Sequence, residues 1–168
     1  MLDYRTEVPA WAFINAEIIQ EAVHRDVLVD AIHHVEQKYG LPLDSLRVIN
    51  PAHVLSLLYC LIVVPKELWL KNEKHPVFDE LNMLDLLRFV TIRTRPPQFD
   101  ANPAFQLLRH LRNAVSHVNF AITDSGLFIF WDQKPGDAIR LFEADMTVTQ
   151  LEQFLSLVGT KLANLRMP

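Results

Sequence analysis

The sequence predicts a mainly α-helical bundle with a small β-meander inserted before the last helix. Over most of the chain, apolar residues recur three or four positions apart, which is the period of an amphipathic helix. Two of these patterns follow an Asn-Pro pair, which is typical of a helix N-terminus. Between about residues 119 and 143 the pattern changes to short apolar or alternating runs separated by turn-forming residues, which indicates strands.

The length and composition are those of one globular domain, which we expect to span residues 1–168. Half of the residues are apolar and 21% are charged, which excludes a disordered tail, and the single Cys excludes an internal disulfide scaffold. The longest apolar run, 54–64, is shorter than the about 20 residues that a membrane-spanning helix needs. The N-terminus lacks the pattern of a secretory signal, so we expect a cytoplasmic protein without a membrane partner.

The first half of the chain predicts two helices. The first runs from about Ala10 to Tyr39, where apolar residues keep helical spacing, and ends at Gly40-Leu41-Pro42. The second begins at Asn50-Pro51, with Asn as the N-cap and Pro as the first helical residue. It is nearly all apolar as far as Val64, so we expect it to be buried.

Two further helices are expected before the meander. One covers about Asp79 to Arg93 and ends before Pro96-Pro97. The next begins at Asn102-Pro103, which repeats the start signal. Its apolar residues form one clean stripe: Ala104, Leu107, Leu108, Leu111, Ala114, Val115 and Val118.

The β-meander is predicted by a change of period after that helix. We expect a hairpin with strands over 119–122 and 127–131, joined by a turn-forming Thr-Asp-Ser-Gly segment. A third short strand is expected over 139–142. The last helix then begins at Thr149-x-x-Glu152, which resembles a capping box, and runs to about Arg166.

Several kinds of site find little support in the sequence. With four Gly in the chain, there is no phosphate-binding loop and no Gly-x-Ser-x-Gly nucleophile motif. Cys60 lies in an apolar run and is expected to pack in the core. Glu21-x-x-His24, with Glu17 one turn earlier, has no second Glu-x-x-His partner, so we predict neither a metal site nor a cofactor. His33-His34 is expected on a solvated helix face.

Positive charge is concentrated in one segment although the whole chain carries a net charge of −4. Residues 88–117 hold five Arg against one Asp, a net charge of +4, which leaves −8 for the rest of the chain. Arg is the side chain that best grips phosphate, because its planar guanidinium donates two parallel hydrogen bonds. A solvated polar face would explain the cluster equally well.

The polar face of the helix after Pro103 carries the chemistry. It holds Gln106, Arg109, His110, Arg112, Asn113, Ser116 and His117, with no carboxylate among them. Asn113 and His117 are four residues apart and therefore neighbours on the helix surface. Arg112 and His117 lie about 140° apart on the helical wheel, at the two edges of this face. Both would face one cleft if a second copy packed antiparallel across them, as in a two-fold dimer.

Arg112-Asn113-x-x-x-His117 resembles the Arg-polar-x-x-x-His signature of HEPN domains, the helical domains named for higher eukaryotes and prokaryotes nucleotide-binding. The stretch from Leu111 to His117 also resembles the residues that usually surround that motif in the family. The clear match covers about ten residues, and the helical frame adds weaker support. The resemblance implies a HEPN-like bundle and a metal-independent endoribonuclease that acts as a homodimer on RNA.

In such an enzyme the 2′-OH of RNA attacks the adjacent phosphate. His117 would transfer protons, because His is the side chain that titrates near neutral pH. Arg112 would stabilise the phosphate, and Asn113 would orient the imidazole or donate to a phosphate oxygen. Arg109, His110 and Ser116 are candidate secondary contacts to the substrate.

Two other interpretations stay open. Some HEPN members are inactive, so the chain is alternatively a module that binds RNA, a nucleotide or a protein, such as an antitoxin or another regulatory partner. The third interpretation is a plain helical dimer in which Arg112 and His117 make structural hydrogen bonds. Loss of activity without loss of stability in His117→Ala would separate catalysis from the structural interpretation.

Overall fold

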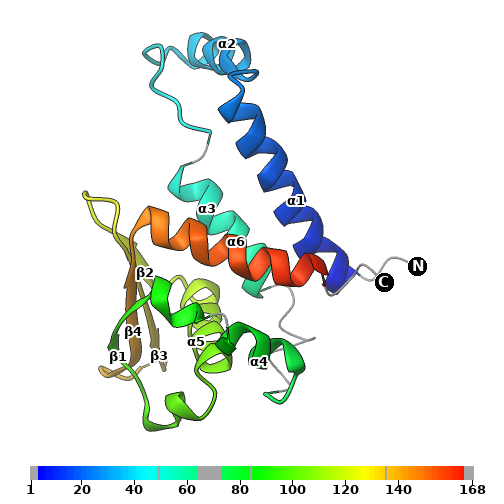
Figure 1. The fold of residues 1–168 in the computed structure, drawn as a ribbon. Helices are drawn as coiled ribbons and strands as arrows, with labels where there is room; N and C mark the ends of the chain where they lie inside the picture. Colours follow the sequence, from blue (N-terminus) through cyan, green and yellow to red (C-terminus); the bar gives the residue numbers. More distant parts are fainter. Residues whose placement is uncertain (1–3, 49, 64–72, 84, 135, 165–168) are drawn as a thin grey trace.

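A computed structural model describes residues 4–48, 50–63, 73–83, 85–134 and 136–164 (Figure 1). The fold class is as predicted: mainly helical, with a small antiparallel sheet before the C-terminal helix. The α-helices are α1 (Tyr4–His24), α2 (Val29–Tyr39), α3 (Pro51–Leu58), α4 (Pro76–Met83), α5 (Pro103–Ser116) and α6 (Val148–Asn164). In the part of the chain that the structure describes, no helix is both long and apolar enough to cross a membrane.

The sheet has four strands in the order β1-β4-β3-β2: β1 (Thr91–Thr94), β2 (Phe120–Ile122), β3 (Phe128–Gln133) and β4 (Arg140–Met146). The predicted hairpin is confirmed, since β2 pairs antiparallel with β3. The predicted third strand is also confirmed as β4, which continues as far as Met146. Helix α5 packs against β3, and the core between helices and sheet is rich in Phe.

The helix expected over Asp79–Arg93 is wrong beyond Met83. Helix α4 ends there, Asp85 has a left-handed backbone with φ of 50°, and a 3-10 turn, η3 (Leu86–Phe89), follows. The next residues form β1 on the edge of the sheet, where Thr91 lies opposite Asp145. The run Val90-Thr91-Ile92 is β-branched and favours a strand once a partner strand is present.

The single helix expected over Ala10–Tyr39 is wrong as well, because the chain breaks into α1 and α2. The break contains Asp26, whose φ of 57° is left-handed and interrupts the helical path. Gly40 ends α2 with φ of 66°, as predicted.

The predicted N-caps at the two Asn-Pro pairs are confirmed. The Asn50 side chain accepts from the amides of Ala52 and His53, and α3 then continues into a π-helical turn, η1 (Tyr59–Val63). Asn102 accepts from the amide of Phe105 at the start of α5.

The last helix is capped two residues earlier than predicted. Thr147 Oγ1 accepts from the amide of Gln150, and Gln150 Oε1 accepts from the amide of Thr147. The Thr149-x-x-Glu152 box is therefore wrong, because the chain leaves β4 at Met146 and enters α6 directly. Residue 166, the expected end, lies outside the described residues.

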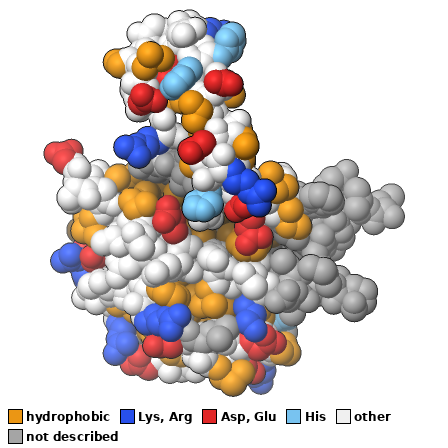
Figure 2. Space-filling model, turned by 45° about the horizontal axis from the view of Figure 1, so that its top comes forward, with side chains coloured by type: hydrophobic (Ala, Val, Ile, Leu, Met, Phe, Trp, Pro, Cys, Tyr) orange, Lys and Arg blue, Asp and Glu red, His pale blue; other side chains and the backbone are white. Residues whose placement is uncertain are grey.

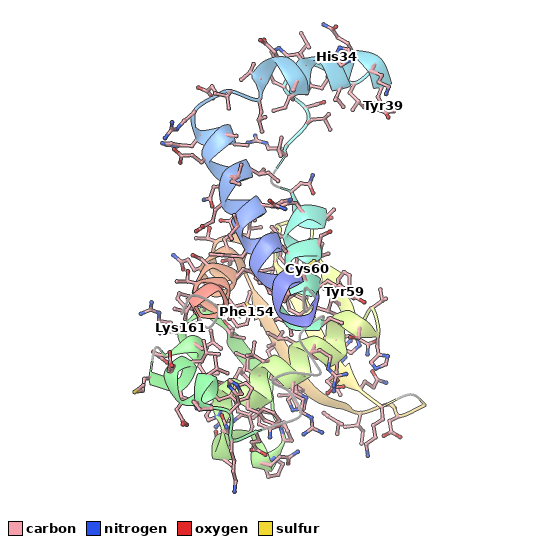
Figure 3. The ribbon with its side chains drawn as sticks, turned by 90° about the vertical axis from the view of Figure 1, so that its right-hand side faces the viewer. His34, Tyr39, Tyr59, Cys60, Phe154 and Lys161 are labelled. Carbon is pink, nitrogen blue, oxygen red and sulfur yellow. The ribbon has the colours of Figure 1, made fainter. Side chains whose placement is uncertain are left out.

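One part of the molecule projects from the body, and we call residues 14–48 the arm. In Figures 1 and 3 the far end of α1, the whole of α2 and the following loop stand away from the sheet and α6. Of the described side chains from Ile14 to His53, only Glu36 is buried. Ile18, Tyr39 and Leu43 are each about 60–70% exposed, and hydrophobic side chains are visible on this end in Figure 2. The arm therefore presents apolar side chains that no described residue covers.

Candidate active site

Helix α5 carries the candidate site and is anchored along its whole length. Asn102 caps its first turn, and the side-chain Oδ1 of Asn82 on α4 accepts a hydrogen bond from the backbone N–H of Ala104 at 2.9 Å. Its apolar stripe is buried from Ala104 to Val115, whereas Val118, which was expected to extend the stripe, lies beyond the end of the helix and is 72% exposed. The helix axis is therefore fixed, and its last turn presents the motif residues in one defined orientation.

The end of α5 is closed by a tight turn around His117, which is the C-cap residue. The backbone N–H of Asn119 donates to the carbonyl of Ala114 at 2.8 Å, and the backbone N–H of Val118 donates to the carbonyl of Val115 at 3.3 Å. Val118 adopts a left-handed backbone with φ of 56°, a conformation that is unfavourable for a β-branched residue. The carbonyl of Asn119 then accepts from the amide of Trp131, so this turn is tied to β3.

The polar face of α5 is not open along its length. Gln106 and His110, which were expected on an open polar face, are only 3% and 4% exposed. The helix packs against β3, and Phe142 of β4 stacks on His110, so the expectation of an open polar face is wrong for these two residues. The sequence pattern of α5 alone cannot reveal which of its polar side chains the sheet covers.

His110 lies within the core rather than at the surface. Its Nδ1 is 2.7 Å from Oδ2 of Asp132, and its ring stacks on Phe142 with centroids 4.8 Å apart. Its Nε2 is buried and has no partner among the described residues. Placed in this way, His110 contacts the site from behind and is not accessible to a phosphate in this conformation.

Asp132 is a residue of the site that the sequence did not reveal. Its Oδ2 accepts from Nδ2 of Asn113 at 2.7 Å as well as from His110. Burial alone would raise the pKa of Asp132, but the hydrogen bonds from His110 and Asn113 and the nearby charges of His110 and Arg109 lower it overall. A signal was present, since Asp132 occupies the same inward face of β3 as Phe128 and Phe130, where an apolar residue is expected.

Arg112 is partly buried at the edge of this cluster. Its Nε is buried and has no hydrogen-bond partner in the described part of the chain. Burial and the neighbouring Arg109 lower the pKa of Arg112, and the charge of Asp132 opposes that shift. A guanidinium in this position lacks a paired anion, so an incoming anion would gain hydrogen bonds there.

Three other predicted residues lie on the surface around the end of α5. Arg109, Ser116 and His117 are exposed, and their side chains make no hydrogen bond or ion pair with any described residue. The cationic side chains of Arg109 and Arg112 and the imidazole of His117 therefore lie around Asn113, with the carboxylate of Asp132 behind it. Such an arrangement suits an anionic ligand that also offers a proton to transfer.

Other sites considered from the sequence do not assemble in the described residues. No group of three or more His, Cys, Asp or Glu there is arranged to hold a metal ion. Glu21 instead pairs with Arg25 at 2.5 Å on the exposed surface of α1. Burial raises the pKa of the Cys60 thiol, which disfavours the thiolate that nucleophilic catalysis needs.

The fold and the site together define a class: a mainly helical domain whose central helix ends in Arg-Asn-x-x-x-His. Residues 3–166 match the model of the family described as HEPN pEK499 p136. Because the match spans nearly the whole chain, the protein belongs to this HEPN family, and the expected resemblance to HEPN domains is confirmed. No curated protein and no solved structure matches the chain.

Proposed function

We propose that the protein is a metal-independent endoribonuclease whose site lies at the end of α5. HEPN domains are typically ribonucleases. The observation that carries the proposal is Arg112, which is only partly buried, has no ion-pair partner among the described residues and belongs to the same last turns of α5 as the exposed His117. An RNA phosphate at this position would receive the guanidinium hydrogen bonds that no described residue takes.

The reaction is an internal displacement at phosphorus. A neutral His117 takes the proton of the 2′-OH as its oxygen bonds to phosphorus, and the bond from phosphorus to the 5′-oxygen breaks. A protonated His117 of a second copy gives its proton to the leaving 5′-oxygen, which yields a 2′,3′-cyclic phosphate and a 5′-OH end. Arg112 stabilises the charge on the phosphorane, and Arg109 and Ser116 contact the neighbouring backbone.

We infer that the working unit is a homodimer. One chain supplies one His117, while the reaction uses a base and an acid. For the two His117 side chains to share one site, the ends of α5 of the two copies have to meet, and the exposed apolar side chains of the arm offer a second, separate surface for the other copy. Stable interfaces take about 20–30 residues from each partner, and the arm, residues 14–48, is long enough to contribute that many. His110 is assigned to support of the site instead of substrate contact, because it is 4% exposed.

The test is cleavage of a mixed-sequence single-stranded RNA in EDTA, with DNA of the same sequence as a control substrate. We expect wild type to cut RNA only, and Arg112→Ala and His117→Ala to lose cutting while remaining folded by circular dichroism. Matched controls are Arg88→Ala, an exposed Arg on η3, and His34→Ala, which lies on α2 at the opposite end of the molecule (Figure 3). RNA binding without cleavage in wild type would instead identify the inactive binding module, and equal cutting by all variants would overturn the proposed site.

A further inference from the structure

The carboxylate of Asp132, which is not part of the Arg112-Asn113-x-x-x-His117 motif, contacts Asn113 of that motif. Asp132 lies on β3, 19 residues beyond Asn113 in the chain, and accepts from Asn113 Nδ2 at 2.7 Å and from His110 Nδ1 at 2.7 Å. Its side chain is 11% exposed and that of His110 is 6% exposed, so water competes little for these bonds. The pairing of β3 with β4 shifts register next to Asp132, and such irregularities are frequent beside functional sites.

An ionised carboxylate only accepts hydrogen bonds, and this decides the orientation of its partners. The Asn113 atom that faces Asp132 must be the NH₂ group, so the carbonyl oxygen Oδ1 is left for other contacts. For the same reason the His110 nitrogen that faces Asp132 must carry its proton. The stacking of His110 on Phe142 holds that ring, and through Asp132 the amide of Asn113, in place.

The consequence falls on His117, which lies one turn beyond Asn113 on the same side of α5. In this conformation the side chain of His117 makes no hydrogen bond with a described residue, but it is exposed and can turn so that a ring N–H donates to Oδ1 of Asn113. An NH₂ group in the place of Oδ1 would repel that N–H. Accepting from one ring nitrogen leaves the other nitrogen as the base, as an orienting carboxylate does for catalytic His in other hydrolases.

We propose that Asp132 is a positioning residue of this site: it fixes the amide of Asn113 so that Oδ1 orients the imidazole of His117. This inference rests on the proposed ribonuclease function. It assigns Asn113 to orientation of His117, because Asp132 holds one N–H of the Asn113 amide and thereby turns Oδ1 away from itself, where it can accept from His117.

Asp132→Asn tests the proposal, and Asp145→Asn is its matched control. Asp145 lies on the neighbouring strand β4, is 7% exposed like Asp132, and pairs with Arg93 instead of α5. We expect Asp132→Asn to lower kcat about 10- to 100-fold with KM within about threefold, the size of effect usual for residues that orient a reacting group. Asp145→Asn should keep kcat within about twofold of wild type.

NMR of the free protein gives a second readout that does not depend on cleavage. The ring ¹⁵N signals of His117 should change in Asp132→Asn and stay as in wild type in Asp145→Asn. If wild type cuts no RNA, the proposed function fails, and these signals alone decide whether Asp132 acts on His117. Unchanged His117 signals in Asp132→Asn, or an equal loss of kcat in both variants, would overturn the positioning role.

Asn113→Ala covers the case in which Asp132→Asn does not fold. It removes the link to His117 but keeps the buried pair of Asp132 with His110. We expect the same loss of kcat with little change in KM. Where Asp132→Asn does fold, combining the two substitutions should cause no further loss. A raised KM with unchanged kcat would show that Asn113 binds the phosphate and would contradict the proposal.

Discussion

Gly159 in α6 lies directly against the ring of Phe13 in α1, and no Cβ fits between them. Phe13 is 6% exposed and is the last buried apolar residue of α1 before the arm begins. The crossing of α1 and α6 at this point joins the base of the arm to the body of the domain. A small residue on α6 therefore decides how closely α1 can approach.

Gly159→Ala should destabilise the protein although Ala favours helices. Overpacking a core contact costs about 1–3 kcal/mol, which outweighs the about 1 kcal/mol that Ala gains over Gly inside a helix. Urea unfolding checks the free energy, with Ser156→Ala at an exposed position of α6 as the control. Equal or greater stability of Gly159→Ala would mean that Phe13 can move away at little cost.

Val118→Gly should stabilise the turn that follows His117. The left-handed backbone costs a residue with a Cβ roughly 1–2 kcal/mol, and Gly removes that strain at the expense of chain entropy, for a net gain of about 1 kcal/mol. Val118 is 72% exposed, so little burial is lost. Ile139→Gly, at an equally exposed position without positive φ, should gain nothing. The idea of strain at Val118 fails if both variants change the unfolding free energy alike.

The carboxylate of Asp132 should make the free energy of unfolding of the domain fall at acidic pH. Its pKa is lowered in the folded protein, so its contribution is present above the ordinary Asp value of about 3.9 and is lost as pH falls through the lower folded value. We expect Asp132→Asn to cost about 1–3 kcal/mol at neutral pH, because two buried donors lose their acceptor charge. Unfolding measured from about pH 6 to pH 2 should show this difference shrinking below about pH 4. A constant difference over that range would refute the assignment.

The loop of the arm should be held best at mildly acidic pH. Glu36 accepts from the amides of Leu46 and Asp44, and these bonds lower its pKa, so the stabilisation is lost as pH falls below about 4.3 and through the lower folded value. The hydrogen bond to Asp44 raises the pKa of His33 in the folded protein. The stabilisation from this bond is therefore complete below about pH 6.5 and is lost as pH rises through the raised pKa of His33.

Amide hydrogen exchange at Asp44 and Leu46, corrected for intrinsic rates, measures this dependence. Protection should be greatest between about pH 4.5 and 6.5. Glu36→Ala should abolish it, while the amide of Trp131 in the sheet keeps its protection as an internal control. Protection that rises steadily from acid to alkaline pH would contradict the role of His33.

Self-association should depend on the arm. Ile18 and Tyr39 are 61% and 67% exposed, so Ile18→Glu and Tyr39→Glu should convert a dimer into a monomer by placing charge in an apolar interface. Met83 is 79% exposed on α4, and Met83→Glu should leave the dimer intact. Light scattering coupled to gel filtration gives the mass of each. A monomeric wild type, or equal dissociation in Met83→Glu, would exclude the arm as the interface between copies.

Local signals in the sequence account for most of the helical frame. Asn50 and Asn102 cap helices as their side-chain chemistry predicts, and Gly40 ends one. These features depend on hydrogen bonds within a few residues, so a linear reading detects them. Strand β1 escaped it because an edge strand is decided by its partner, and the partner β4 lies about 50 residues further along the chain.

The sequence by itself determined helix α5, its cap at Asn102, its buried stripe and the order of Arg112, Asn113 and His117, because all of these follow from helical period and local bonding. Only the tertiary structure decided which polar residues of α5 the sheet covers. It also brought Asp132, 22 residues beyond His110, into contact with the motif helix. That contact depends on how β3 packs across α5: the alternation of β3 places Asp132 on the inward face, but it does not say which helix that face meets.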